Sequence, residues 1–203
     1  MKLQYGLPAI EIGTSPRRIL ALIQVLLLAT FSQVASAQSD AELIALLQDG
    51  SHIGLMRHST APGSDDPPDF RLGDCSTQRN LSEGGRAQAI EIGDRLRETG
   101  ITDARILSSQ WCRCIDTAEL MAFGPVEELP SLNSLYSFPG QGGRMTRDTA
   151  SWIAEQDLNR PTILVTHQIN ISSLLRTGAE EGDIVVARRD TDGLTLVGRL
   201  RLY

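Results

Sequence analysis

The stretch Ile53-Gly54-Leu55-Met56-Arg57-His58-Ser59 decides the fold, because an apolar run ends there in an arginine and a histidine. Such a run predicts a buried strand. Side chains alternate across a strand, so Arg57 and His58 can face one pocket only if the chain leaves extended geometry at the strand's carboxyl end. Open α/β sheets have their ligand crevices at those ends. The Arg-His pair alone is weak evidence for a functional site, so the ends of the other predicted strands have to be considered as well.

The composition is that of one ordinary globular domain. The chain has 203 residues, of which 41% are hydrophobic and 22% charged, and this is enough for a sizeable core. Its formal net charge of −6 argues against a nucleic-acid partner, which would need a basic surface. In such an acidic chain, a local cluster of arginines is informative.

Residues 1–37 predict a secretory signal peptide. Arg17 and Arg18 precede an apolar run over 19–31, and Ala35-Ser36-Ala37 has the small residues that a signal peptidase requires. The run is shorter than the roughly 20 residues that span a bilayer, so a retained membrane anchor is the weaker alternative. The flanking residues match a twin-arginine signal poorly, which favours the general export route. We therefore expect a single domain over 38–203, located in the periplasm or secreted.

Three cysteines follow the predicted cleavage point and would meet an oxidising compartment. They are Cys75, Cys112 and Cys114. If the segment around Cys112 is helical, the last two lie on nearly opposite sides of it. Cys75 can then pair with only one of them, and the sequence leaves open which. Three buried, reduced thiols are the alternative.

Strand and helix patterns alternate along the rest of the chain. We expect helices near 39–47, 82–98, 111–122, 149–156 and 169–176, and strands near 53–57, 105–109, 126–129, 162–166, 184–187 and 194–202. The order strand, helix, strand predicts parallel pairing, and the last two strands favour an antiparallel hairpin. Residues 59–80 and 138–143 are rich in Pro and Gly, and we expect the first segment to form a rim over a pocket.

Three of these strands end in polar side chains. The first ends in Arg57 and His58, the second in Ser108-Ser109 with Arg113 one turn into the next helix, and the late strand in His167. We expect these ends to meet at one edge of the sheet. Guanidinium groups bind phosphate oxygens through paired hydrogen bonds, and a helix N-terminus adds backbone donors. The pattern predicts a phosphoryl-binding pocket.

Four motifs in this order resemble the histidine phosphatase superfamily, also called phosphoglycerate mutase-like. The resemblance covers about residues 52–175 and implies an α/β fold, a three-layer α/β/α sandwich with a mostly parallel central sheet. The motifs are Leu55-Met56-Arg57-His58, Arg79-Asn80-Leu81-Ser82-Glu83-Gly84-Gly85-Arg86-Ala87-Gln88-Ala89, Ser108-Ser109 with Arg113 and Asp116-Thr117-Ala118-Glu119, and Val165-Thr166-His167.

The resemblance implies that His58 is the nucleophile that becomes phosphorylated. It implies that Arg57, Arg113 and His167 complete the phosphate pocket. A neutral imidazole would attack phosphorus in line, and the guanidiniums would stabilise the charge on the equatorial oxygens. Neither a metal nor another cofactor is required for this chemistry.

Two positions depart from the family pattern. Ser59 replaces the glycine that usually follows Arg-His. The glutamate that donates a proton in mutase-like members is missing, because the corresponding stretch reads Leu132-Asn133-Ser134, and Gln168 stands where other members have an aspartate. A leaving group that needs little help is one explanation. The other is that a loop carboxylate supplies the proton, with Glu128, Asp65 and Asp148 as the open alternatives.

These observations favour an extracytoplasmic phosphomonoester hydrolase that acts through phosphohistidine. The expected substrate is a small-molecule or envelope-linked phosphomonoester, and the only expected membrane contact is an uncleaved signal segment. The alternative is a phosphoryl-ligand binding protein of the same fold with little or no turnover. A metal hydrolase built on the three histidines is weaker, since no carboxylate lies at ligand spacing beside them. Among the other arginines, Arg71 is favoured over Arg79 and Arg86 as a further substrate contact.

Overall fold

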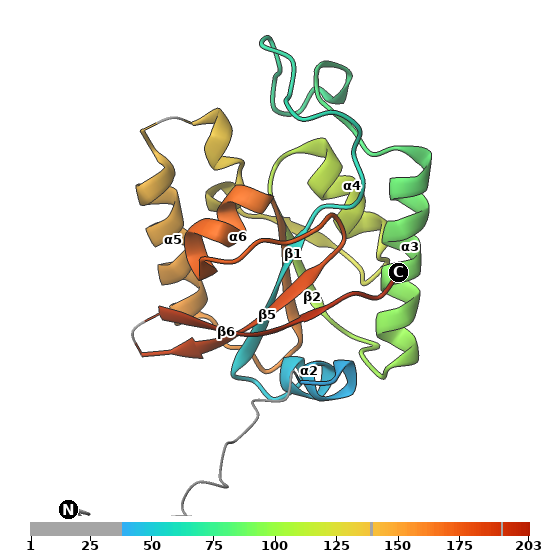
Figure 1. Cartoon of the computed structure of the whole chain (residues 1–203), viewed down its shortest axis with the longest axis vertical. Helices are drawn as coiled ribbons and strands as arrows, with labels where there is room; N and C mark the ends of the chain where they lie inside the picture. Colours follow the sequence, from blue (N-terminus) through green and yellow to red (C-terminus); the bar gives the residue numbers. More distant parts are fainter. Residues whose placement is uncertain (1–37, 139, 192) are drawn as a thin grey trace, which may run out of the picture. The chain divides into compact units, whose positions relative to one another are not determined.

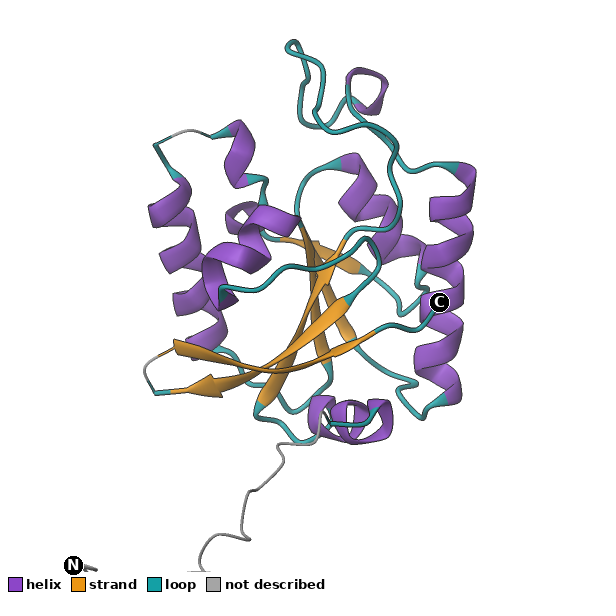
Figure 2. Cartoon of the chain, viewed as in Figure 1, coloured by secondary structure: helices purple, strands orange, loops and turns teal. Residues whose placement is uncertain are grey.

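The structure is a computed structural model that describes residues 38–138, 140–191 and 193–203. The predicted signal peptide lies outside these residues. One mixed sheet forms the centre (Figures 1 and 2), and its strand order is β3-β2-β4-β1-β5-β6. Strands β3, β2, β4 and β1 are parallel, β5 runs antiparallel to β1, and β6 pairs antiparallel with β5 to form a hairpin. The predicted mostly parallel sheet and closing hairpin are confirmed.

The elements alternate along the chain as the sequence predicts. The strands are β1 (His52–Arg57), β2 (Arg105–Ser108), β3 (Val126–Glu128), β4 (Thr162–Thr166), β5 (Ile184–Asp190) and β6 (Gly193–Leu200). The helices are α2 (Asp40–Leu47), α3 (Glu83–Glu98), α4 (Cys112–Leu120), α5 (Gly142–Glu155) and α6 (Gln168–Leu175). Short 3₁₀ turns lie at Cys75–Thr77, Pro130–Leu132 and Leu135–Ser137.

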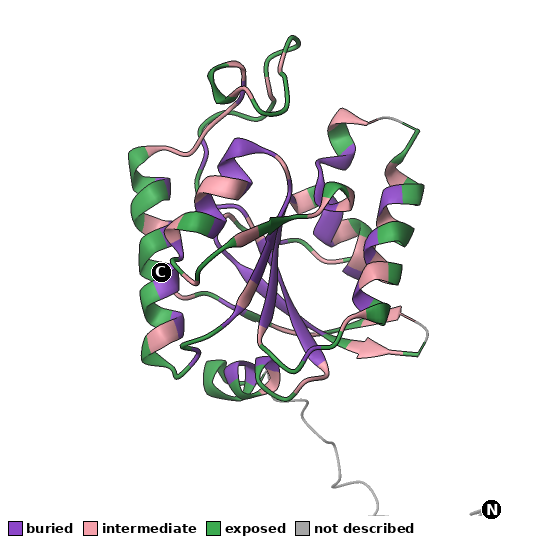
Figure 3. Ribbon diagram, turned by 180° about the vertical axis from the view of Figure 1, so that it is seen from behind, coloured by how far each residue is buried: buried purple, intermediate pink, exposed green. Residues whose placement is uncertain are grey.

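Helices cover both faces of the sheet and make the three layers. On one face, α2, α3 and α4 pack against a core that includes Met56, Ile106 and Val165. On the other face, α5 and α6 pack against a second core that includes Leu55 and Leu164. Neighbouring residues of one strand therefore face opposite layers, and the central strands are buried from both sides (Figure 3). This confirms the predicted three-layer sandwich.

Two differences from the predicted elements lie between β3 and β4. Helix α5 begins at Gly142, seven residues before the predicted start, so part of the segment expected to be a loop is helical. Its first turn contains Gly142 and Gly143, which are poor helix formers and mask the signal. The two 3₁₀ turns before it are too short to give a periodic pattern. Among the described residues, no helix is both long and apolar enough to cross a membrane.

Candidate active site

Three polar strand ends meet at one edge of the sheet. Strand β4 lies between β1 and β2, with Arg57 beside Thr166 and Ser108 beside Val165. The residues that follow each strand therefore converge, as the sequence predicts. They open onto a cavity of about 190 Å³ lined by Arg57, His58, Ser64, Asp65, Asp66, Arg79, Arg113, Ser134, Tyr136, Ser137, His167, Gln168 and Ile169. All four predicted site residues line this one cavity.

His58 presents one ring nitrogen as an acceptor. Its backbone N–H still donates to the Thr166 carbonyl at 3.0 Å, so the residue stays fixed to β4 after strand β1 has ended. Its Nδ1 lies 2.8 Å from the Ser59 carbonyl oxygen, which can only accept. Nδ1 therefore carries the proton, and Nε2, which receives the Arg113 Nε–H at 3.2 Å, keeps its lone pair. This is the tautomer that a nucleophilic imidazole needs.

His167 takes a defined tautomer as well. Arg113 Nη2, which can only donate, lies 3.3 Å from its Nδ1. The opposite nitrogen, Nε2, then donates to the Ser109 hydroxyl at 2.9 Å. That hydroxyl lies 3.3 Å from the Asn133 side-chain oxygen. Asn133 occupies the stretch where the family pattern has a glutamate, and here it supports the second histidine through Ser109.

Burial and nearby arginines keep both imidazoles neutral. Burial, followed by the charge of Arg113, lowers the pKa of His58 to about 3. The same two causes lower the pKa of His167 well below its ordinary value. The two rings lie 5.6 Å apart, measured between their centroids. The cavity thus combines two neutral nitrogen bases with several fixed positive charges.

Two arginines of the cavity have a buried nitrogen without a partner. Arg57 donates to the Ala179 carbonyl at 3.1 Å and lies 3.3 Å from the Glu181 carboxylate. Arg79 donates to the Ala61 carbonyl at 2.6 Å and to the Gly63 carbonyl at 3.0 Å. In both side chains, Nε is buried and has no hydrogen-bond partner. Unpaired buried donors are costly, and an anion in this cavity would satisfy them.

Arg79 lies in the cavity, although the sequence ranks it below Arg71 as a substrate contact. It lines the cavity, and burial together with the charge of Arg113 lowers its pKa. Arg71, which the sequence favours as a substrate contact, lies outside the cavity lining, is 70% exposed in its side chain and pairs with Asp74. Helical or strand periodicity is missing in this loop, so periodicity does not separate the two arginines. The quoted motif that begins at Arg79 was the one available hint.

Helix α6 adds backbone donors to the cavity wall. It begins directly after His167, and no side chain caps its first turn. Its first two residues, Gln168 and Ile169, line the cavity. The first N–H groups of a helix have no partner within the helix and favour anions. The predicted helix N-terminus at the pocket is therefore present.

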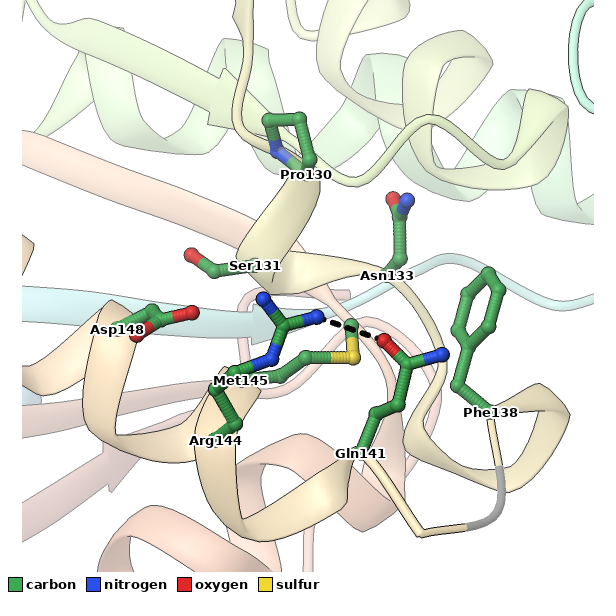
Figure 4. Close-up of a pocket in the computed structure, with 8 residues that line it drawn as sticks. All are labelled: Pro130, Ser131, Asn133, Phe138, Gln141, Arg144, Met145 and Asp148. Carbon is green, nitrogen blue, oxygen red and sulfur yellow. Dashed lines mark hydrogen bonds between the residues drawn. The ribbon is translucent and has the colours of Figure 1, made fainter.

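Of the three carboxylates left open as proton donors, only Asp65 lines this cavity. Glu128 accepts from the Gln110 side chain at 3.0 Å outside the cavity. Asp148 lines a separate cavity of about 240 Å³ beside the 3₁₀ turn at Pro130–Leu132, where Arg144 bonds to Gln141 (Figure 4). The positions of Glu128 and Asp148 disfavour both as donors to a phosphoryl group held by His58.

A disulfide joins the rim loop to the helix that carries Arg113. Cys75 pairs with Cys112, and Cys114 is buried as a free thiol. Of the two pairings that the sequence left open, this one connects residues 59–80 to the first turn of α4.

Among the described residues, no group of three or more His, Cys, Asp or Glu side chains is arranged to hold a metal ion.

Comparison with known proteins gives a family match over part of the chain and a fold. Residues 53–136 match the family described as "Histidine phosphatase superfamily (branch 1)". No curated protein matches the sequence. The structure resembles the protein histidine phosphatase SixA complexed with tungstate, at 16% identity and a TM-score of 0.53, over 73% of this chain and 96% of that one.

Two further solved structures have the same fold. One is the putative phosphohistidine phosphatase SixA from Agrobacterium tumefaciens, at 21% identity and a TM-score of 0.52, over 74% of this chain and 98% of that one. The other is a mycobacterial glucosyl-3-phosphoglycerate phosphatase with inorganic phosphate, at 16% identity and a TM-score of 0.52, over 72% and 94% of the two chains. Residues 53–136 of this chain therefore match the histidine phosphatase superfamily, branch 1, and the described domain has the fold of these solved phosphatase structures.

Proposed function

We propose that this protein is a member of the histidine phosphatase superfamily and a phosphomonoester hydrolase that acts through a phosphohistidine on His58. Its substrate is an extracytoplasmic phosphomonoester, either a small molecule or a group linked to the cell envelope. The observation that carries the proposal is the unprotonated Nε2 of a buried, neutral His58 at the centre of an arginine-lined cavity.

The proposed reaction has two displacements at phosphorus. In the first, the Nε2 lone pair of His58 forms the bond to phosphorus while the ester P–O bond breaks. Arg57, Arg79 and Arg113 bind the equatorial oxygens, where the negative charge is spread. In the second, water attacks the phosphohistidine, inorganic phosphate leaves, and His58 returns to its neutral form.

The leaving oxygen takes up one proton in the first displacement, and the attacking water returns one proton to the same donor in the second. Asp65 is the donor we propose, because it lines the cavity and makes no ion pair among the described residues, whereas Asp66 pairs with Arg113. Its exposed position on the rim suits a group that meets the outer part of a substrate. An ester with an acidic leaving group would depend little on this donor.

Two observations support an extracytoplasmic location. Residues 1–37 have the pattern of a secretory signal peptide. The domain also contains the Cys75–Cys112 disulfide, and such bonds persist mainly in oxidising compartments.

The relatives support the chemistry, since one is described in complex with tungstate and another with inorganic phosphate. Both ligands are tetrahedral oxyanions of the kind that this cavity would hold.

The test is phosphate release from p-nitrophenyl phosphate by the purified protein without added metal. His58→Ala should reduce the rate to background, because it removes the nucleophile. His52→Ala is the matched control, since His52 lies at the opposite end of β1 and bonds to Asp49. It should keep the wild-type rate. Phosphate binding without any turnover in the wild type would instead favour the alternative, a phosphoryl-ligand binding protein.

A further inference from the structure

Asp66, on the rim loop, is a buried carboxylate beside the cavity. Its side chain is 8% exposed and lies against Arg113, whose side chain is 4% exposed. Arg113 Nη1 lies 2.8 Å from one oxygen of Asp66 and 3.1 Å from the other. A buried ion pair of this kind costs desolvation and needs further hydrogen bonds to persist.

Those further hydrogen bonds are present. The Trp111 indole N–H donates to one carboxylate oxygen at 2.8 Å, and the backbone N–H of Arg79 donates to the other at 3.0 Å. Burial alone would raise the pKa of the Asp66 carboxyl, but the hydrogen bond and charge of Arg113, with these two donors, hold it below its ordinary value. Asp66 is therefore an anion and does not serve as the proton donor for a leaving group.

The guanidinium of Arg113 divides its donors between two sides. Nη1 faces Asp66, while Nε lies 3.2 Å from His58 Nε2 and Nη2 lies 3.3 Å from His167 Nδ1. A guanidinium is planar and rigid, so fixing one nitrogen fixes the directions of the other two. The carboxylate on one side thus determines which donors point at the two histidines on the other.

We propose that Asp66 is a positioning residue that orients Arg113 toward the phosphoryl group and, through the backbone of Arg79, anchors a second phosphate-binding arginine. The inference rests on the proposed function and adds to it a residue of the rim loop that lies 47 residues from its partner Arg113 in the sequence. Asp66 touches neither the phosphoryl group nor the leaving group in this account. It acts by holding Arg113 in the geometry that the transition state needs.

The first test compares Asp66→Asn with Asp69→Asn, an exposed position on the same loop. Asp66→Asn should lower kcat/KM for p-nitrophenyl phosphate by about 100-fold, as expected for a misplaced catalytic group. It should weaken the binding of orthovanadate, a transition-state analogue, more than the binding of inorganic phosphate. Both affinities are measured by calorimetry. Asp69→Asn should match the wild type in all three measurements. Equal behaviour of the two variants would overturn the proposal.

A double-mutant cycle with Arg113→Lys separates positioning from a general structural role. Lysine keeps the charge but lacks the planar fork, so Asp66 has no orientation left to set. Asp66→Asn should therefore cost less than about 3-fold in that background, since residues that act through each other are not additive. The same loss of activity in both backgrounds would mean that Asp66 does not act through Arg113.

Thermal unfolding identifies any variant that does not fold. If Asp66→Asn is unfolded, Asp66→Glu replaces it, because it keeps the buried charge but moves the carboxylate. Asp66→Glu should fold and still bind orthovanadate more weakly than the wild type, and wild-type affinity in it would overturn the proposal. If the wild type has no turnover, the proposed function fails, while the orthovanadate and phosphate affinities still test Asp66.

Discussion

At the scale of single residues, the two buried histidines make the stability of the domain depend on pH. An imidazole in the unfolded chain titrates near about 6.5, whereas burial and Arg113 lower the pKa of folded His58 to about 3. Between these two values the unfolded state binds more protons than the folded state. The contribution of His58 is therefore complete above about pH 6.5 and is lost as the pH falls toward 3.

This predicts a steeper loss of stability in the wild type than in His58→Asn. The free energy of unfolding is measured in urea at pH 7.5 and pH 5, in buffers without phosphate, because a bound anion would stabilise the folded state. Asparagine is close to histidine in shape and does not titrate, so the variant should lose less stability between the two pH values. An equal loss in both proteins would show that His58 is not held neutral.

Arg79 should bind phosphate, and Arg71 should not. Arg79→Ala removes a guanidinium whose buried Nε has no partner in the cavity, and a lost charge-assisted hydrogen bond corresponds to roughly 10- to 100-fold in affinity. Arg71→Ala removes an exposed arginine from outside the cavity lining and serves as the matched control. Calorimetric titration with phosphate distinguishes them. Similar affinities for the two variants would exclude Arg79 from the phosphate site.

The sequence predicted the cavity residues that follow strands, ranked Arg79 on the loop too low, and did not identify Asp66. Arg57, His58 and His167 end buried runs, so a parallel sheet alone brings them together. Asp66 gave no such signal, because its partner Arg113 lies 47 residues away and nothing in a Pro- and Gly-rich loop says which carboxylate turns inward. Only the folded rim distinguishes Asp66 from its exposed neighbour Asp65.

At the scale of elements, helix α3 begins in close contact with the segment that follows His58. Ser82, which precedes this helix, donates its backbone N–H to the Thr60 carbonyl at 3.0 Å. A Cβ on Gly85 would lie 2.0 Å from that same oxygen, whereas a Cβ on Gly84 would have its nearest neighbour at 3.8 Å. A glycine is therefore required at position 85 but not at 84.

Gly85→Ala should destabilise the domain by about 1 to 3 kcal/mol, the usual cost of overpacking. It should also reduce activity, because the displaced backbone is close to His58 in sequence. Gly84→Ala, the matched control, should be neutral or stabilise by up to about 1 kcal/mol, since alanine is the better helix former. Urea unfolding of both variants checks this. Equal stabilities would mean that the contact with Thr60 adjusts without cost.

The disulfide should stabilise the rim loop and, through it, the site. It closes a loop with a sequence separation of 37 between Cys75 and Cys112. Replacing both cysteines by serine should lower the free energy of unfolding by roughly 2 to 4 kcal/mol. A reductant should bring the wild type to the level of the variant and leave the variant unchanged. A wild type that is insensitive to reductant would contradict this prediction.

Element types were more predictable than element ends. The apolar runs of β1 and β4 are buried on both faces, so composition alone identified them. Helix α5 was predicted too short because its first turn is exposed and contains two glycines, and its buried side of Met145, Thr149 and Ile153 was only partly recognised. Contacts with the 3₁₀ turn at Pro130–Leu132, including Thr149 with the Ser131 carbonyl at 3.1 Å, stabilise this helix. Such contacts are not visible in the sequence.

At the scale of the whole molecule, an acidic chain surrounds a cavity rich in arginine. The net charge of −6 excludes a general attraction to phosphate, so the cavity must select its ligand by local geometry. Three guanidiniums are only partly neutralised there by Asp66 and Glu181. The layered fold makes this concentration of charge possible, because the strand ends and helix α6 fix the positions of the cavity side chains.

A prediction about export also concerns the whole molecule. When the full chain is produced in a bacterium, residues 1–37 should direct it across the inner membrane, and the mature protein should begin at Gln38. Mass spectrometry of the protein from the periplasm or medium checks the new N-terminus, and thiol alkylation before digestion checks the cysteines. The Cys75–Cys112 pair should resist alkylation without reductant.

A matched version without residues 1–37 should stay in the reducing cytosol, where Cys75 and Cys112 should be reduced. Recovery of the full chain with its leader intact and all three thiols alkylatable would place the enzyme, and its substrate, inside the cell.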